Sequence, residues 1–182
     1  MAQIEMYKYP QYCERYVLVN RFAFAINYRV ASTAFCRSLG IRYYSSSRRY
    51  NQFNIPCVYY HDKITLCLFR NPVEKFISSL NIVNIKIDNA IQLIQNSYLK
   101  QDIHFLDQSR FHGYPVVFYR YPDKIPDICE ILDINIPKIR NKSTKKIDTT
   151  SVQQNKIQEI YKKDYEIWDD LQKNNGICEI YQ

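Results

Sequence analysis

The hydrophobic pattern of the chain changes its period at one place, and this change predicts a strand followed by a helix. Residues 64–69 form a short apolar run rich in strand-forming residues, which is typical of a strand buried on both faces. From Val73 onward the apolar residues recur at intervals of three and four, as on one face of a helix. Between the two patterns, Asn71 can cap a helix and Pro72 suits its first position. We therefore expect the strand to end at Arg70 and the helix to begin at Pro72.

Other apolar runs predict strands that alternate with helices along the chain. The expected strands cover residues 16–26 (one broken strand or two short ones), 41–44, 64–69 and 115–121. The expected helices, besides the one that begins at Pro72, cover residues 33–39, 87–98, 125–132 and 152–172. This alternation favours an α/β fold with a mainly parallel sheet. We find no internal repeat and no second domain, so one domain is expected to span residues 1–182.

The composition indicates a globular chain, and its positive net charge favours anionic partners. Hydrophobic residues make up 46% of the chain and charged residues 24%, which excludes a disordered protein. The net charge of +7 favours a phosphorylated cofactor, an acidic glycan, nucleic acid or a membrane surface, and does not choose among them. Only three glycines are present, which argues against a glycine-rich nucleotide loop.

The cysteines indicate free thiols and no metal site. The six cysteines are Cys13, Cys36, Cys57, Cys67, Cys129 and Cys178. No two of them form a CxxC pair, and no histidine stands at metal-ligand spacing from one. Cys36, Cys67 and Cys129 lie in apolar periodic segments, so we expect them to be buried and unpaired, as in a reducing compartment.

The chain shows no targeting segment and no membrane span. Residues 1–16 are polar and rich in tyrosine, and the longest apolar runs have only the length of strands. We therefore expect a soluble cytoplasmic protein with no membrane partner, of bacterial or viral origin.

Residues 27–35 form the first candidate anion site. A strand, a turn and a helix start follow one another there, which directs backbone N–H groups and the positive end of the helix at an anion. Ser32 and Thr33 add hydroxyl groups, and Arg29 adds a permanent charge with a planar fork of donors. The plain alternative is an ordinary helix start with Ser32 as its N-cap.

Arg70 and Ser78 form the second candidate anion site. Arg70 follows a buried strand and precedes a helix start, the place where anionic ligands bind in open α/β sheets. Ser78 lies two turns into that helix, and its side chain leans back toward the helix start. Glu74 stands at the capping-box position, so it is first a capping residue. The plain alternative is a capped turn with a solvated arginine.

These two segments resemble elements of the sulfotransferases that use 3′-phosphoadenosine 5′-phosphosulfate (PAPS). Residues 70–78 resemble the family's Arg-x-Pro-x-x-Arg-x-x-Ser element, in which the arginine and the serine hold the 3′-phosphate, with Lys75 in place of the second arginine. Residues 29–33 are similar to the family's 5′-phosphosulfate loop, with Arg29 in place of a lysine. Because an arginine cannot lend a proton, we expect slower catalysis or a proton supplied from elsewhere.

The resemblance also implies a catalytic base. Residues 104–108 resemble a His-aromatic-x-Pro-Gln segment of the carbohydrate sulfotransferases, with Asp107 in place of the proline. Histidine is suited to take the proton of an acceptor hydroxyl, so His104 is the first candidate and His61 the second. The alternative is a structural histidine that holds a loop.

Further positions extend the resemblance or depart from it. Asn141 begins an Asn-x-Ser sequence that the family often has before its last helix, and Tyr161 and Asp164 form a Tyr-x-x-Asp pair in that helix. Asp164 is expected to position Tyr161, itself a core residue. The basic run at residues 138–146 is either a lid over the phosphates or a solvated linker. Pro122 stands where relatives usually carry a glutamate, which puts the acceptor or the activity in doubt.

Together the segments predict a small PAPS-dependent sulfotransferase of the carbohydrate branch. The resemblance implies a three-layer, P-loop NTPase-like fold in a minimal soluble form. It also implies sulfuryl transfer from PAPS to a hydroxyl acceptor on a glycan, with no metal. His104 and Arg29 would be catalytic. The predicted PAPS-binding residues are Arg29, Val30, Ala31, Ser32, Thr33, Ala34, Arg70, Ser78 and Asn141. The alternatives are a catalytically silent PAPS- or nucleotide-binding module and, last, a basic nucleic-acid-binding protein, for which no known motif is present.

Overall fold

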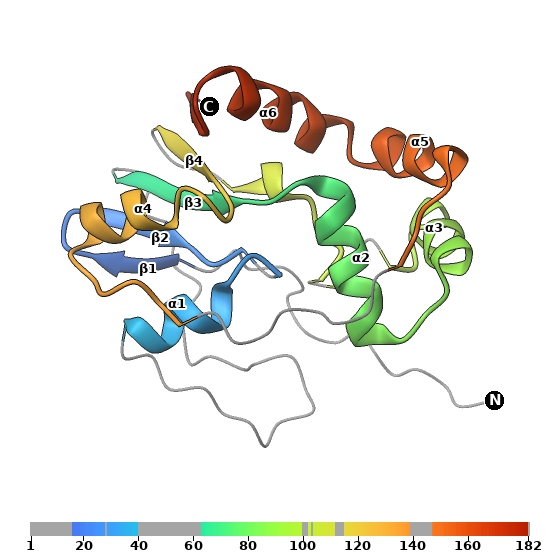
Figure 1. The fold of residues 1–182 in the computed structure, drawn as a ribbon, viewed down its shortest axis with the longest axis horizontal. Helices are drawn as coiled ribbons and strands as arrows, with labels where there is room; N and C mark the ends of the chain where they lie inside the picture. The colour runs from blue at the N-terminus through green and yellow to red at the C-terminus, as the bar shows by residue number, and fades with distance from the viewer. Residues whose placement is uncertain are drawn as a thin grey trace.

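The computed structural model describes residues 16–27, 29–39, 63–99, 102, 104–111, 115–138 and 147–181, which form a sheet with helices on both faces (Figure 1). The strands are β1 (Tyr16–Val19), β2 (Phe22–Ala25), β3 (Ile64–Phe69), β4 (Val116–Arg120) and β5 (Ile177–Ile180). The helices are α1 (Ser32–Ser38), α2 (Pro72–Val83), α3 (Ile87–Gln95), α4 (Ile125–Leu132), α5 (Ser151–Ile160) and α6 (Lys162–Lys173), with a 3-10 helix at Gln108–Arg110. The strand expected at 41–44 lies outside the described residues.

The sheet is mixed, so the expectation of a mainly parallel sheet is wrong. Its strand order is β1-β2-β3-β4-β5; β2, β3 and β4 run parallel, while β1 and β5 pair antiparallel at the edges. β1 and β2 are joined by the two-residue turn Asn20–Arg21, and so short a connection allows only an antiparallel pair. β5 begins beside the carboxyl end of β4, where the Arg120 N–H donates to the Gly176 carbonyl, so it runs back along β4.

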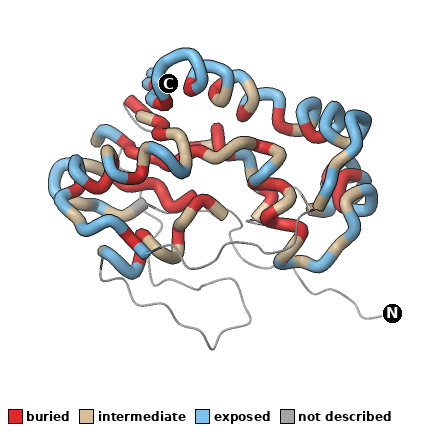
Figure 2. The backbone as a smooth tube through the Cα atoms, in the orientation of Figure 1, coloured by how far each residue is buried: buried red, intermediate tan, exposed pale blue. Residues whose placement is uncertain are grey.

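Alternate residues of the central strands pack against helices on opposite faces of the sheet. Phe24 and Leu66 belong to a cluster with α1 and α4. Their neighbours Ala25 and Cys67 belong to a second cluster, with α6. Figure 2 shows the buried positions along the strands and on the side of α6 that faces them. Burial of both faces explains why residues 64–69 read as a continuous apolar run, and that prediction is confirmed.

The helices α2, α3 and α5 pack together beyond the carboxyl end of β3 (Figure 1). The predicted helix 152–172 is in fact two helices, α5 and α6, which meet at Tyr161. Tyr161 has the non-helical dihedrals φ −109° and ψ 36°, and its hydroxyl donates to the Phe105 carbonyl at 2.7 Å. The break therefore depends on a distant segment, which the regular spacing of apolar residues does not reveal.

Local helix signals match the structure closely. Asn71 caps α2 by accepting from the Glu74 N–H, Pro72 is the first residue of that helix, and α4 has the predicted bounds. Ser32 is not an N-cap, because α1 begins at Ser32 itself and its N-cap is Ala31 in a left-handed conformation (φ 55°). The four cysteines that the structure describes are buried, and no disulfide joins any two of them. Among the described residues, no helix has the length and apolarity that a membrane crossing requires.

Candidate anion-binding site

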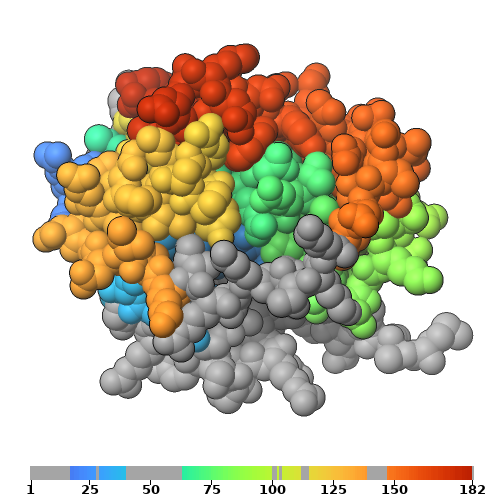
Figure 3. Space-filling view, viewed as in Figure 1, coloured from blue at the N-terminus to red at the C-terminus, as the bar shows by residue number. Residues whose placement is uncertain are grey.

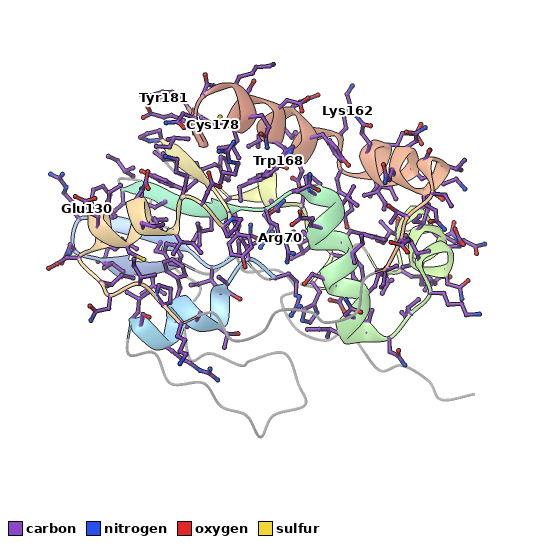
Figure 4. All side chains as sticks on the ribbon, in the orientation of Figure 1. Arg70, Glu130, Lys162, Trp168, Cys178 and Tyr181 are labelled. Atoms are coloured by element: carbon purple, nitrogen blue, oxygen red, sulfur yellow. The ribbon has the colours of Figure 1, made fainter. Side chains whose placement is uncertain are left out.

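The candidate site lies at the carboxyl ends of β2 and β3. The two strands are parallel neighbours, with Ala25 opposite Cys67, so the segments that follow them leave the sheet at the same edge. Arg29 follows β2, and Arg70 follows β3 directly before α2. Figure 4 shows Arg70 at the junction of β3 and α2. In the space-filling view, the start of α2 reaches the surface between the β4–α4 segment and α5 (Figure 3).

Arg29, Arg70 and Ser78 lie side by side at this edge. The Arg29 guanidinium donates to Ser78 Oγ from both Nε (3.1 Å) and Nη2 (2.7 Å). Arg70 Nη1 donates to the Arg29 carbonyl oxygen at 3.4 Å. Burial, and after it the charge of Arg70, lowers the pKa of Arg29. Two guanidinium groups and one serine hydroxyl therefore lie close together, where α2 meets the loop after β2.

A pocket of about 70 Å³ opens over these residues. Its lining residues are Arg29, Ala31, Ser32, Thr33, Ala34, Arg37, Arg70, Ser78, Tyr121 and Lys138. Pockets that enclose a whole small molecule measure roughly 300–1,000 Å³. The described pocket therefore suits a single anionic group rather than a whole nucleotide.

Most of the residues predicted to bind PAPS line this pocket. The exceptions are Val30, which is buried in the core beside α1, and Asn141, which lies outside the described residues. Arg37 and Tyr121 were not predicted as binding residues, whereas Lys138 begins the basic run expected to be either a lid over the phosphates or a solvated linker. Arg37 stands four positions after Thr33, so a helix-face argument could have found it.

Tyr121 and Glu74 both contact the Arg70 side chain. The Arg70 guanidinium lies over the Tyr121 ring, 5.5 Å from its centroid. Glu74 Oε2 accepts from Arg70 Nε at 3.2 Å, although Glu74 is largely exposed. Glu74 therefore does not complete a capping box in α2, and its carboxylate competes with any anion for Arg70.

The loop between β2 and α1 has a strained backbone. Arg29 (φ 67°) and Ala31 (φ 55°) are both left-handed, which costs of order 1–3 kcal/mol for each residue that is not glycine. Such strain persists only where surrounding contacts impose the conformation, and it is concentrated at functional sites. Here it accompanies the hydrogen bond between the Arg29 carbonyl and Arg70.

A buried amide network supports the two arginines from below. Gln108, with 0% of its surface exposed, accepts from Asn27 Nδ2 (3.1 Å) and from the Arg70 N–H (2.9 Å), and donates to the Arg70 carbonyl (2.7 Å). Asn27 Nδ2 also donates to the Leu68 carbonyl at 2.9 Å. The network joins the ends of β2 and β3 to the 3-10 helix, so it determines where Arg70 leaves the sheet.

Residues 104–109, here called the clamped segment, are held by α2 on one side. Lys75 Nζ donates to the carbonyls of Leu106 (2.6 Å) and His104 (3.2 Å), and Ser79 Oγ donates to the His104 carbonyl (2.6 Å). Lys75 is only 3% exposed, and burial, with the charge of Arg110 second, lowers its pKa to about 7. Lys75 is therefore a structural residue; in the element that residues 70–78 resemble, it stands in place of the second arginine.

The start of α6 holds the clamped segment from the other side. The Tyr161 hydroxyl donates to the Phe105 carbonyl, and the Asp164 carboxylate accepts from the N–H groups of Gln108 and Ser109, each at 2.8 Å. Tyr161 is buried in the core, as expected. The expectation that Asp164 positions Tyr161 is wrong, because the two side chains bind different backbone groups of the clamped segment.

His104 forms a pair with Asp102. Its Nδ1 lies 2.7 Å from Asp102 Oδ1, and its backbone N–H donates to the same oxygen at 2.8 Å. Burial raises the pKa of Asp102, but the hydrogen bonds from His104 outweigh it and lower that pKa overall. His104 does not line the pocket; Ser79, which binds its carbonyl, directly follows Ser78 of the pocket. The sequence did not single out Asp102.

Comparison with protein-family models, with curated proteins and with solved structures finds no match to this chain. The resemblance to sulfotransferases therefore stays a prediction from short motifs. His61, Asn141 and residues 139–146 lie outside the described residues. The convergence of Arg29, Arg70 and Ser78 is the structural observation on which a function can be argued.

Proposed function

We propose that this chain binds PAPS and transfers its sulfuryl group to a hydroxyl, with a carbohydrate as the acceptor. The observation that carries the proposal is that Arg29, Arg70 and Ser78, two cations and one hydroxyl, line one pocket. These residues come from the two segments that resemble the family's anion-binding elements. The geometry supports binding of an anionic group, and the resemblance to sulfotransferases is the reason for proposing PAPS as the ligand that carries it.

The proposed reaction is an in-line transfer that needs charge and position more than covalent chemistry. The acceptor oxygen attacks the sulfur, the bond from sulfur to the bridging oxygen breaks, and adenosine 3′,5′-bisphosphate leaves with that oxygen and its electron pair. Arg37 and Lys138 line the pocket and can stabilise the charge that develops on the leaving group. Lys138 carries an ammonium, which can lend a proton where an arginine cannot.

The acceptor proton requires a base, and the pair of His104 and Asp102 supports that assignment. Asp102 faces Nδ1 of the ring, so an N–H at Nδ1 leaves Nε2 as the acceptor of a proton. The clamped segment fixes the backbone of His104 through Lys75 and Ser79. His104 can act only on an acceptor that extends from the pocket across this side of α2.

Binding and transfer are tested in turn. Calorimetry with adenosine 3′,5′-bisphosphate is expected to show binding that adenosine does not, and sulfur-labelled PAPS is expected to label a hydroxyl acceptor from a glycan panel. If the bisphosphate binds no better than adenosine, the proposal is wrong.

The second candidate is a module that binds PAPS without turnover. Two observations favour it: Arg29 stands in place of the proton-lending lysine and directs its guanidinium at Ser78, and His104 does not line the pocket. Binding of the bisphosphate with no label transferred to any acceptor would select this candidate over the enzyme.

A further inference from the structure

The side chain of Arg29 extends to α2, where it meets Ser78. Both donors of one edge of its guanidinium, Nε and Nη2, point at Ser78 Oγ at 3.1 and 2.7 Å. The resemblance assigns these two residues to opposite ends of the nucleotide, with Arg29 at the 5′-phosphosulfate and Ser78 at the 3′-phosphate. The structure brings both side chains to one point, and this conflicts with the assignment.

The contact uses the part of arginine that recognises anions. The edge formed by Nε and Nη2 matches two oxygens of a phosphate or carboxylate. Here both donors are directed at one hydroxyl oxygen, which takes the position that an anion's oxygen would have relative to Arg29. Ser78 keeps its own O–H to donate. An anion that displaces this contact and lies between the two side chains would therefore receive hydrogen bonds from both.

Charge favours a dianion at this point. Arg70 reaches the Arg29 backbone at 3.4 Å, so the two arginines lie close together, and their mutual repulsion, after burial, lowers the pKa of Arg29. A terminal phosphate monoester carries about −1.5 to −2 charge at pH 7 and three acceptor oxygens. The phosphoryl and sulfuryl groups of a phosphosulfate carry one negative charge each. The pair of arginines therefore matches the 3′-phosphate better than either group at the other end.

We infer that Arg29 binds the 3′-phosphate together with Arg70 and Ser78, and that it determines specificity for ligands that carry this phosphate. This inference rests on the proposed function for the identity of the nucleotide. It removes Arg29 from the leaving group. Because the pocket suits a single anionic group, the 5′ side of the ligand then extends beyond it, toward α1 and Lys138.

The test compares ligands that differ only in the position of the phosphate. Calorimetry on the whole chain would use adenosine 3′,5′-bisphosphate, adenosine 3′-monophosphate and adenosine 5′-monophosphate. The variant is Arg29→Asn, because asparagine tolerates the left-handed backbone at φ 67°. We expect about tenfold or greater loss of affinity for the two ligands with a 3′-phosphate, and less than about twofold loss for the 5′-monophosphate. Arg37→Gln is the matched control, and its loss should not depend on the 3′-phosphate.

Each outcome separates this inference from the proposed function. An equal loss for both monophosphates, or a loss only for the 5′-monophosphate, overturns the role of Arg29 and leaves PAPS binding intact. A parent chain that fails to bind the bisphosphate overturns the proposed function and the inference with it. If the monophosphates bind too weakly to be titrated directly, their affinities are measured by competition against adenosine 3′,5′-bisphosphate, and the same comparison of parent and variant decides.

Discussion

The pocket and the clamped segment hold charged side chains in opposite ways. In the pocket, the Arg70 side chain is 23% exposed, and its hydrogen-bond partners are the Arg29 carbonyl and the carboxylate of the exposed Glu74. At the clamped segment, the charged side chains that hold it, Lys75 and Asp164, are 3% and 1% exposed, and both bind its backbone groups. The pocket leaves its charged groups partly exposed, whereas the groups that hold the clamped segment lie in the interior.

This difference in exposure distinguishes residues that can bind a ligand from residues that hold the binding residues in position. A surface carboxylate contributes little to stability, so an anion can replace it at Arg70 at small cost. A buried charge that loses its partner is costly, so Lys75 and Asp164 are not available to a ligand. Gln108 connects the regions, because its backbone N–H binds Asp164 and its side chain binds the Arg70 backbone.

Removing the Asp164 carboxylate is expected to have the largest effect. Asp164→Ala leaves the N–H groups of Gln108 and Ser109 buried without an acceptor. Each such group costs about 1–3 kcal/mol, so the free energy of unfolding should fall by about 2–6 kcal/mol in urea denaturation. Asp169→Ala, at an exposed position of the same helix, should change it by less than about 0.5 kcal/mol. Equal losses in the two variants would show that the clamp contributes little.

On the pocket side, Arg70→Ala should weaken ligand binding and leave the fold intact. Loss of charged hydrogen bonds predicts an affinity for adenosine 3′,5′-bisphosphate about 10–100-fold lower. The unfolding free energy should change by less than about 0.5 kcal/mol, because the side chain lies at the surface. Arg21→Ala removes the same charge at the other end of β2 and should bind as the parent does. An Arg70→Ala chain that binds normally would exclude Arg70 from the site.

The buried Lys75 predicts a stability that rises with pH. Burial lowers its pKa in the folded chain from the usual 10.5 to about 7. Between these two pH values the unfolded chain binds more protons than the folded one, so stability increases as pH rises through this window. The expected gain from pH 7 to 9 is about 1–2 kcal/mol. Urea denaturation of the parent and of Lys75→Met measures it, because the variant lacks this dependence. Parallel pH profiles would contradict a lowered pKa at Lys75.

Asp102→Asn tests whether the clamped segment also serves catalysis. Asparagine keeps an acceptor for the His104 backbone and loses the negative charge beside the ring. If Asp102 positions His104 as a base, kcat for sulfuryl transfer should fall about tenfold or more, while affinity for the bisphosphate changes less than about twofold. An unchanged kcat with an unchanged pH profile would show that His104 is a structural histidine that holds a loop, and not a catalytic base.

The smallest effect is expected from Glu74→Gln. This change removes the carboxylate that competes for Arg70, so affinity for adenosine 3′,5′-bisphosphate should rise about twofold at low salt. The gain should shrink as salt increases, because the pair is exposed. A loss of affinity would show that Glu74 orients Arg70 for the ligand rather than competing with it.

Local signals in the sequence determined the elements around the site. The apolar run of β3, the Asn71 cap and Pro72 identify the β3–α2 junction, because caps and periodicity act within a few residues. The same reasoning identified α4 and found Arg70 and Ser78 as candidates. It did not find β5, which is four residues long, because so short a run carries too little periodicity.

The tertiary structure alone decided how the site is assembled. The contact of Arg29 with Ser78 joins residues 49 positions apart, and the bond from Gln108 to Asp164 joins residues 56 apart. The burial of Lys75, the break at Tyr161 and the antiparallel pairing of β5 with β4 depend on similarly distant partners. Side-chain chemistry and hydrophobic periodicity are properties of short segments. Which distant residue a side chain contacts depends on how the whole chain packs. For this reason the sequence indicated anion-binding residues, and only the fold showed that they share one pocket.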